Sequence, residues 1–251
     1  MLIVKDLCAG YNGANVIHNI NVTARKGKIL CVLGPNGCGK TTLLKSIARI
    51  VDYRGSILMN GKDLSVFPRK DLAQKIAFLG QVSQVYFPYT VYETIAMGRY
   101  PWSKGIFKDL SAEDKTIIDN VINLLEMGDI QDRMIDTVSG GQLQRVFLAR
   151  TLAQTPDIIL LDEPTNHLDL KYQIALLSFL KSYVKENDKI LIGVFHDLNL
   201  ARHFGDTALL MNGGTIAACG AIEETLNRDT LQTVYGMDVC AFMQESLGKW
   251  G

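Results

Sequence analysis

Apolar runs of strand length alternate with segments of helical period along most of the chain. Each run is short and almost uniformly apolar, which is typical of a strand that is buried on both faces. The alternation predicts an α/β fold whose core is a largely parallel sheet. The strand candidates are Ile29 to Leu33, Ile76 to Leu79, Ile158 to Leu161 and Leu191 to Phe195.

Two other stretches carry turn signals instead of this pattern. Residues 1 to about 28 are interrupted at Gly10 and at Asn12-Gly13. Residues 52 to 61 contain the segment Gly55 to Gly61, which is typical of a hairpin arm. Both stretches predict short strands, which we expect to form an antiparallel β layer beside the parallel core.

The region between about residues 81 and 154 has a third pattern. An aromatic, turn-rich segment gives way to a stretch of helical period from Ser111 to Met127, where Ser111 offers an N-cap and Glu113 and Asp114 early acids. We therefore expect a helical subdomain inserted between strands. The whole of residues 1–251 forms one domain in this interpretation, with the core and β layer at about 1–80 and 155–251. The last thirty residues carry no strong motif.

Composition and charge narrow the class of protein. With 251 residues, 47% hydrophobic and 21% charged, the chain has the size and make-up of one folded unit. Lys plus Arg equals Asp plus Glu, at 26 each, so the net charge gives no attraction to nucleic acid, and no nucleic-acid partner is expected. No apolar stretch approaches the roughly 18 residues of a membrane-spanning helix, so any membrane passage would belong to another chain. The cysteines are scattered, which disfavours a disulfide framework or metal site and suits a reducing cytoplasm.

The strongest chemical signal is a glycine-rich segment between the strand Ile29 to Leu33 and a helical stretch. Glycines let backbone N–H groups face phosphate oxygens, Lys40 can reach the β and γ phosphates of a nucleotide, and Thr41 offers its hydroxyl to Mg²⁺. The sequence therefore predicts a nucleotide-binding phosphate loop. Its residues are Gly34, Pro35, Asn36, Gly37, Cys38, Gly39, Lys40, Thr41 and Thr42.

Two adjacent carboxylates follow the apolar strand Ile158 to Leu161. Ligands of α/β sheets bind at this carboxyl edge of the strands. Asp162 can hold the Mg²⁺ through water, and Glu163, pointing elsewhere, can orient or deprotonate the water that attacks the γ-phosphate. Next to a phosphate loop, the pair predicts nucleotide hydrolysis.

A second glycine-containing helix start lies at Ser139, Gly140, Gly141 and Gln142, which we call the signature segment. Its exposed N–H groups and helix dipole favour an anion, yet the phosphate loop already cradles the phosphates of the chain's own nucleotide. The signature segment is therefore expected to serve a nucleotide held by another subunit.

With these three segments in this order, the chain resembles the ABC family of ATPases along nearly its whole length. The resemblance implies a P-loop NTPase fold with a RecA-like parallel core. It also implies further roles: Gln81 senses Mg²⁺ and the γ-phosphate, His196 contacts the γ-phosphate and helps to hold the water, and Asp169 lies in a loop that senses the other subunit's site. Tyr11 fits the aromatic residue on which adenine stacks.

Two positions depart from the usual family pattern. Cys38 stands where many relatives carry Ser or Ala, and Val138 replaces the usual Leu before Ser139. Neither change removes a catalytic group. Because Cys38 precedes Lys40 at a helix start, we expect its thiol to have a lowered pKa and to be alkylated before buried cysteines such as Cys31.

The resemblance also implies partners and a mechanism. Two copies of the chain would sandwich two ATP molecules with Mg²⁺, each between one phosphate loop and the other copy's signature segment, and hydrolysis would open this homodimer. The segment Thr90 to Trp102 is similar to subunits that power import of iron–siderophore complexes, haem and cobalamin. This implies a place on the cytoplasmic face of the cell membrane, beside integral-membrane permease subunits and, indirectly, a substrate-binding protein. An aromatic set is either subdomain core or a socket for a permease helix: Tyr86, Phe87, Tyr89, Tyr92, Tyr100 and Trp102.

Two alternatives remain at this point. Soluble ABC ATPases act in DNA repair, iron–sulfur cluster and translation processes, but the chain shows neither the long coiled-coil insertion nor the second ATPase unit that many of them carry. A non-hydrolysing assembly module is the other alternative, and the presence of Glu163 and His196 disfavours it.

Overall fold

The apolar runs pair into the central sheet of the computed structural model, which describes residues 1–80, 88–103, 110–166 and 168–249. The strand order of this sheet is β10-β9-β3-β8-β7-β6. Neighbours from β9 to β6 are parallel, and β10 pairs antiparallel with β9 at one edge, so the predicted parallel core is confirmed. The strands are β3 (Lys28–Leu33), β6 (Ile76–Leu79), β7 (Ile158–Asp162), β8 (Ile190–Val194), β9 (Thr207–Asn212) and β10 (Thr215–Ala221).

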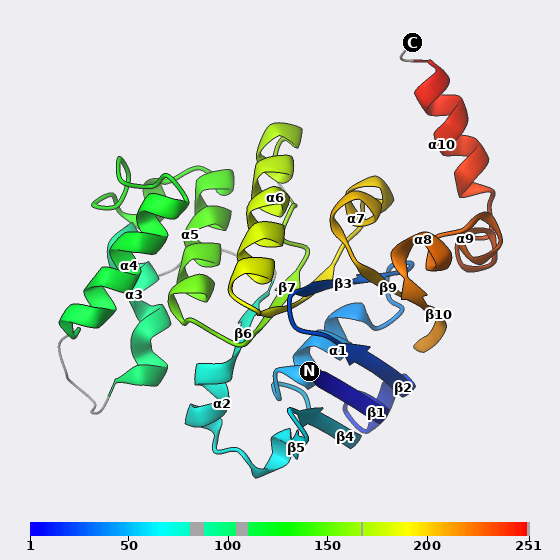
Figure 1. Cartoon of the computed structure of the whole chain (residues 1–251), viewed down its shortest axis with the longest axis horizontal. Coiled ribbons are helices and arrows are strands. Elements are labelled where there is room, and N and C mark those ends of the chain that lie inside the picture. The colour runs from blue at the N-terminus through cyan, green and yellow to red at the C-terminus, as the bar shows by residue number, and fades with distance from the viewer. Residues whose placement is uncertain (81–87, 104–109, 167, 250–251) are drawn as a thin grey trace.

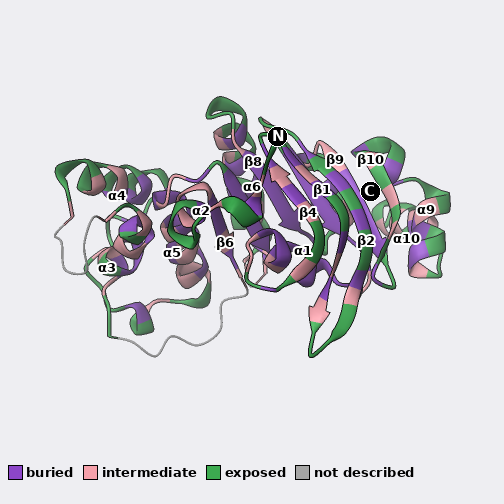
Figure 2. Cartoon of the chain, turned by 90° about the horizontal axis from the view of Figure 1, so that it is seen from below, coloured by how far each residue is buried: buried purple, intermediate pink, exposed green. Residues whose placement is uncertain are grey.

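Alternate residues of the central strands face two separate hydrophobic cores. In β3, Leu30 and Val32 belong to the core beneath the second sheet, whereas Ile29, Cys31 and Leu33 belong to the core beneath the helices. Every residue of β7 and β8 is buried, as the purple strands of Figure 2 show. Burial on both faces accounts for the continuous apolar runs in the sequence.

The second sheet is antiparallel, with the order β2-β1-β4-β5. Its first two strands have 10 and 11 residues, so the expectation of short strands here is wrong. Gly10 lies inside a strand, where a Cβ atom would be 1.9 Å from the carbonyl oxygen of Ala14. The hairpin predicted around Gly55 to Gly61 is present. The strands are β1 (Leu2–Tyr11), β2 (Ala14–Ala24), β4 (Tyr53–Met59) and β5 (Lys62–Asp63).

The helices of residues 91–153 lie together at one end of the molecule (Figure 1). The predicted cap at Ser111 is present: its hydroxyl accepts from the N–H of Asp114, whose carboxylate accepts from the N–H of Ser111. The helix ends at Leu124, earlier than predicted, and Glu126 beyond it has a φ of 52°. The elements are α3 (Val91–Ala96), η2 (Met97–Trp102), α4 (Ala112–Leu124), η3 (Ile135–Thr137) and α5 (Gly140–Ala153).

Arg99 links these helices. It is only 6% exposed, its Nε lies 2.7 Å from Asp114 Oδ1, and its Nη1 donates to the carbonyl of Ala153 at 2.7 Å. Since a buried charge is tolerated only when it is paired and hydrogen-bonded, Arg99 fixes η2, α4 and the end of α5 relative to one another.

The other helices cover the central sheet and extend the chain beyond it. α6 and α7 lie over one face, and α10 projects away from the body at the carboxyl end (Figure 1). In the described residues, no helix is both long enough and apolar enough to cross a bilayer. These elements are α1 (Lys40–Ile47), η1 (Leu64–Val66), α2 (Arg69–Lys75), α6 (Leu170–Glu186), α7 (Leu198–Phe204), α8 (Ile222–Thr225), α9 (Arg228–Tyr235) and α10 (Val239–Gly248).

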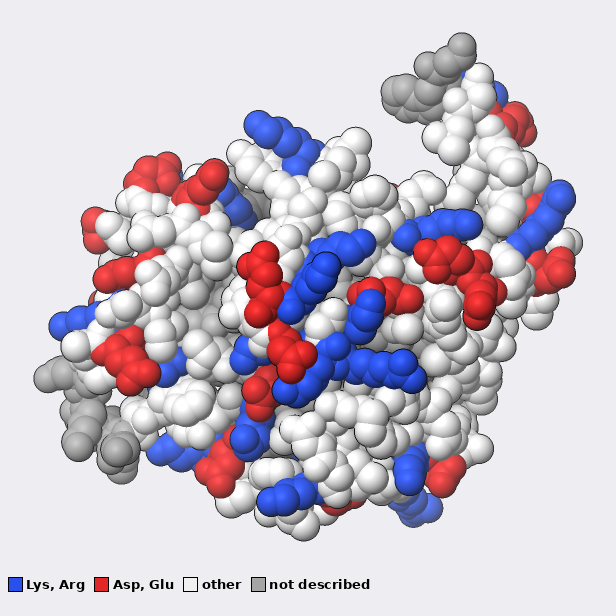
Figure 3. All heavy atoms as spheres, viewed as in Figure 1, with Lys and Arg blue, Asp and Glu red and all other residues white. Residues whose placement is uncertain are grey.

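Charges of both signs share the surface. Figure 3 shows basic and acidic side chains side by side across the middle of one face. Ion pairs such as Lys28–Asp206, at 2.8 Å, and Lys26–Asp188, at 2.9 Å, reflect this mixing. The view shows no broad surface of a single sign.

Candidate functional site

The phosphate loop, residues 34–42, joins the carboxyl end of β3 to α1. Gly34 and Gly39 have φ angles of 140° and 98°, which side-chain-bearing residues rarely adopt. There is also no room for a side chain: a Cβ atom would lie 2.1 Å from the carbonyl oxygen of Met211 at Gly34, and 2.3 Å from Ile17 Cγ2 at Gly39. The two sheets therefore contact the loop from both sides, and a side chain is sterically excluded at Gly34 and Gly39.

Lys40, the first residue of α1, is turned into its own loop. Its ammonium nitrogen donates to the carbonyl oxygens of Gly34, at 2.7 Å, and Pro35, at 2.9 Å. The side chain is buried, so these carbonyls replace water around the charge. The ammonium is thus held at the centre of the loop.

Asp162 and Thr41 face each other across the gap between β7 and α1. The Thr41 hydroxyl donates to Asp162 Oδ1 at 3.1 Å. Burial raises the pKa of the Asp162 carboxyl, while the hydrogen bond from Thr41 works in the opposite direction. A hydroxyl and a carboxylate oxygen this close are donors of the kind that Mg²⁺ prefers, so the residues present fit that ion.

Glu163 and Asp162 have different partners, and both oxygens of Glu163 have one. Its Oε1 lies 2.5 Å from His196 Nε2, and its Oε2 accepts from the side-chain amide of Asn166. Its backbone has a φ of 57°, and its N–H donates to the carbonyl of Val194 at 3.3 Å. The carboxylate is therefore held between two side chains at the ends of neighbouring strands. The contact with Asn166 was not predicted, because no pattern in the sequence indicates it.

The signature segment begins α5 with a complete capping box. The N–H of Gln142 donates to Ser139 Oγ at 3.3 Å, and the N–H of Ser139 donates to Gln142 Oε1 at 2.9 Å. A Cβ atom on Gly140 would meet nothing within 4 Å, so the glycines leave this helix start open. In the described part of the chain, no hydrogen bond joins the segment to the phosphate loop.

Behind its open start, α5 contacts the loop that follows β7 and the helix after that loop. The buried side-chain amide of Gln144 donates to the carbonyl of Pro164 at 3.2 Å. The guanidinium of Arg145 lies 5.4 Å from the ring centre of Tyr172 in α6. Through these contacts the signature segment is placed relative to Glu163. The sequence gives no separate signal for Gln144.

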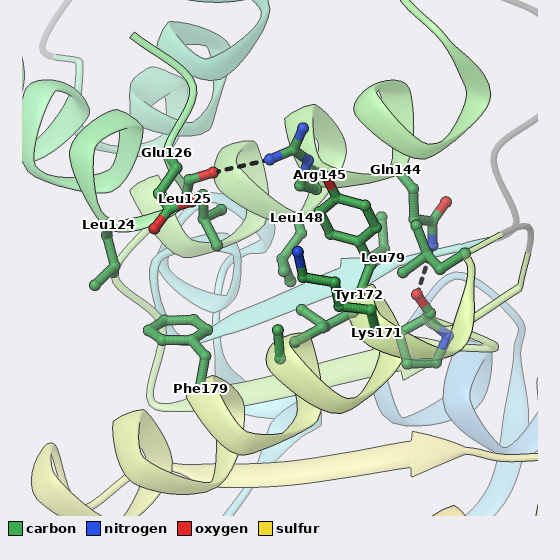
Figure 4. A pocket seen from close by; sticks show the side chains of 14 residues that line it. Leu79, Leu124, Leu125, Glu126, Gln144, Arg145, Leu148, Lys171, Tyr172 and Phe179 are labelled. Carbon is green, nitrogen blue, oxygen red and sulfur yellow. Dashed lines mark hydrogen bonds between the residues drawn. The ribbon is translucent and has the colours of Figure 1, made fainter.

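A cavity of about 430 Å³ lies beside these contacts, between α4, α5 and α6, and we call it the seam cavity. Its walls are mostly apolar, and Figure 4 shows Arg145, Lys171 and Tyr172 around it with Leu148 and Phe179. It is lined by Leu79, Leu124, Leu125, Glu126, Gln144, Arg145, Leu148, Pro164, Leu168, Lys171, Tyr172, Ala175, Leu176 and Phe179.

The other predicted site residues lie at the edges of this region. Tyr11 ends β1 with its side chain 45% exposed. Asp169 caps α6, because its Oδ1 accepts from the N–H of Tyr172 at 3.0 Å. Gln81 lies outside the described residues, so its predicted role stays a prediction.

The aromatic set divides between core and surface. Tyr92 packs against the core beneath the helices. Tyr89 and Tyr100 are 41% and 70% exposed. The indole N–H of Trp102 donates to the carbonyl of Gln154 at 3.0 Å. Tyr86 and Phe87 lie outside the described residues.

Cys38 differs from its prediction. Its side chain is 4% exposed, and burial raises the pKa of the thiol, although the charge of Lys40 acts to lower it. The prediction of a lowered pKa is therefore wrong, because desolvation outweighs the lysine and the helix start. The predicted order of alkylation, with Cys38 before Cys31, stays a prediction. Burial also raises the pKa of Cys31.

Comparisons with known proteins agree with this geometry. The family model described as ABC transporter matches residues 17–166. The chain is 37% identical over 238 residues to the iron(3+)-hydroxamate import ATP-binding protein of Bacillus subtilis, covering 94% of this chain and 88% of that protein.

Two solved structures show the same fold. A structure described as an inward-facing conformation of a metal-chelate type ABC transporter aligns with a TM-score of 0.82 at 28% identity, covering 94% of this chain and 89% of the other. A dimeric ATP-binding cassette bound to ADP and phosphate aligns with a TM-score of 0.78 at 26% identity, covering 88% of this chain and 99% of the other.

Proposed function

This chain belongs to the ABC transporter family of ATP-binding subunits, and we propose that it powers import of a metal chelate through a separate membrane permease. As a member of that family it binds ATP and is an ATPase. The choice of a metal chelate, such as an iron–siderophore, haem or cobalamin-like molecule, is supported by the hydroxamate importer and the metal-chelate transporter to which the chain is similar.

One observation carries the proposed mechanism: the ends of β3, β7 and β8 bring different chemical groups to one edge of the sheet. Lys40 lies inside the phosphate loop, Asp162 faces Thr41, and Glu163 is held against His196. Phosphoryl transfer needs a cation at the phosphates, oxygen donors for Mg²⁺ and a base for the water, and these groups match that need.

The proposed reaction follows from these positions. Lys40 and the loop amides bind the β and γ phosphates, and Thr41, Asp162 and Gln81 would hold Mg²⁺, which would neutralise phosphate charge. Glu163 accepts a proton from water as the water oxygen bonds to the γ-phosphorus and the bond to the bridging oxygen of ADP breaks. His196, 2.5 Å from Glu163 Oε1, keeps the carboxylate in place and contacts the γ-phosphate.

ABC subunits of importers work as dimers with permease partners, and we propose that this dimer is formed by two copies of the chain. The open start of α5 at Ser139 supports this, because it presents free N–H groups that the chain's own loop does not use. Each ATP is then held between one phosphate loop, with adenine on Tyr11, and the partner's signature segment. Asp169 lies at the dimer interface in this arrangement.

The proposed permease contact lies on the helices of residues 91–153. Tyr89 and Tyr100 are exposed large side chains, and the seam cavity offers an apolar recess between these helices and α6. An exposed apolar recess with aromatic neighbours is typical of a protein contact. We place the chain on the cytoplasmic face of the membrane, with a substrate-binding protein as an indirect partner.

Glu163→Gln tests the mechanism. The amide keeps the shape but cannot take a proton, so the variant should bind MgATP normally and hydrolyse it about 10²- to 10⁴-fold more slowly. It should also accumulate as an ATP-bound dimer. Phosphate release and size-exclusion chromatography of the purified chain measure both properties.

The matched control is Glu186→Gln, which makes the same chemical change at an exposed residue at the end of α6. It should hydrolyse ATP at the wild-type rate. Wild-type turnover by Glu163→Gln would rule out the role given to this carboxylate.

A further inference from the structure

The loop between β7 and α6 is held at its backbone by two glutamine side chains. From α5, the buried amide of Gln144 donates to the carbonyl of Pro164 at 3.2 Å (Figure 4). From α6, the amide of Gln173 donates to the carbonyls of Thr165 and Leu168, each at 3.1 Å. The path of the chain just after the two site carboxylates is therefore fixed from both flanking helices.

Asn166 lies inside this loop and turns back to Glu163. Its backbone N–H donates to the carbonyl of Glu163 at 3.3 Å, and its side-chain nitrogen donates to Glu163 Oε2. An ionised carboxylate only accepts hydrogen bonds, so the amide of Asn166 must turn its NH₂ group toward it. Because Asn166 has a short side chain on a fixed backbone, its amide is already in place for Oε2.

The two oxygens of Glu163 are held in different ways. Oε1 lies 2.5 Å from Nε2 of His196, which follows another strand and has a side chain that is 40% exposed. In the proposed reaction His196 also contacts the γ-phosphate, so its hold on Oε1 is shared with the nucleotide and Oε1 becomes available to the water. Oε2, bonded to Asn166 within the same loop, is then the fixed end of the carboxylate.

We propose that Asn166 is a positioning residue for hydrolysis, which holds Oε2 of Glu163 so that Oε1 faces the attacking water. The last torsion of a glutamate side chain is broad, so a free carboxylate turns easily. A hydrogen bond from a fixed amide to one oxygen narrows that torsion. This matters because a base must lie within hydrogen-bond reach of the proton that it takes. The inference rests on the proposed role of Glu163 as the base.

Asn166→Ala tests the inference by removing the amide. The kcat of ATP hydrolysis should fall about ten- to a hundredfold, as for the loss of a hydrogen bond to a charged group. The KM for ATP should change less than about twofold, because Lys40 and the amides of the phosphate loop are untouched. Asn166→Gln keeps an amide donor on a longer side chain, so its kcat should lie between those of wild type and Asn166→Ala.

Asn187→Ala is the matched control, because it removes the same side chain where the amide donates to the carbonyl of Tyr183 at 2.9 Å, at the far end of α6. It should leave kcat and KM unchanged and melt within a few degrees of Asn166→Ala. Wild-type kcat in Asn166→Ala, an equal loss in Asn187→Ala, or a kcat of Asn166→Gln no higher than that of Asn166→Ala would overturn the inference.

A double-mutant cycle shows whether Asn166 acts through the carboxylate. In the Glu163→Gln background, Asn166→Ala should slow the residual single-turnover hydrolysis by less than about twofold, because the group that it positions is already gone. A further loss as large as in the wild-type background would contradict the inference and leave the proposed function intact. Wild-type turnover by Glu163→Gln alone would instead overturn the proposed base and this inference together.

Discussion

The pKa of Cys38 depends on two opposing influences. Lys40 and the start of α1 favour a thiolate, and both are readable from the sequence. Burial favours the neutral thiol and depends on the core beneath the second sheet, to which Cys38 belongs. The effect of burial on the pKa is the larger one, so Cys38 serves as a small apolar residue beneath the phosphate loop.

Alkylation of the cysteines by a maleimide reagent should follow this balance. At pH 7, the exposed Cys219 should react before Cys38, because Cys38 is buried. The pKa of Cys38 is raised, so its thiolate fraction, and with it the rate, should still be rising with pH where an ordinary thiol near pKa 8.5 has levelled off. Mass-spectrometric mapping measures the order of reaction between about pH 6.5 and 9.5, the useful range for thiols. Reaction of Cys38 first at pH 7 would contradict the prediction.

At the scale of elements, three helices begin with the same reciprocal cap, at Thr90, Ser111 and Ser139. The caps at Ser111 and Ser139 use the same hydroxyl chemistry, and only the second is followed by two glycines. This pair separates what Ser139 contributes to the helix from what it contributes to a nucleotide.

Ser139→Ala and Ser111→Ala should each lower the free energy of unfolding by about 1 kcal/mol, because each removes one N-cap. Only Ser139→Ala should weaken the ATP-dependent dimer, measured in the Glu163→Gln background by size-exclusion chromatography. Urea unfolding provides the stability comparison. Equal dimerisation by the two alanine variants would show that the hydroxyl of Ser139 acts within α5 alone.

Elements were predictable where their signals are local. The strands β3, β6, β7 and β8 were found within one residue at each end because they are buried on both faces. The long strands β1 and β2 were read as short because Gly10 looks like a turn, whereas it is required by the close approach of Ala14. β9, β10 and the helices after them lack such signals and were not predicted.

The same division applies to the site. The phosphate loop is contiguous in sequence, and its glycines and lysine are sufficient to predict it. The contact of Glu163 with His196 forms because β7 and β8 are neighbours in the sheet, which spacing along the chain does not specify.

At the scale of the whole molecule, the seam cavity lies between α4 and α5 on one side and α6 on the other. Arg99 fixes the far end of α5, while Gln144 and Arg145 contact the core near its start. A permease segment that enters the cavity would therefore act close to the signature segment. If the proposed permease contact is correct, the cavity would serve coupling rather than hydrolysis.

Ala175→Trp should fill the seam cavity from α6 and weaken permease binding at least about tenfold, a loss typical of a central interface position. ATP hydrolysis by the chain alone should stay within about twofold of wild type. Ser178→Trp adds the same ring to an exposed residue of α6 outside the cavity lining and is the control. Co-purification with the permease and its stimulation of hydrolysis are the measurements, and equal retention by both variants would place the permease elsewhere.

The left-handed backbone conformation of Glu163 lowers the stability of the folded chain at a residue with a proposed catalytic role. A glutamate with a φ of 57° lowers the free energy of unfolding by on the order of 1 kcal/mol, and a glycine at this position would not have that cost. Among variants selected purely for resistance to heat, Glu163→Gly should therefore be favoured, and the proposed mechanism predicts slow hydrolysis for it because the carboxylate is lost. A selection for heat-resistant variants of this protein would therefore enrich variants with impaired ATP hydrolysis, unless hydrolysis were selected at the same time.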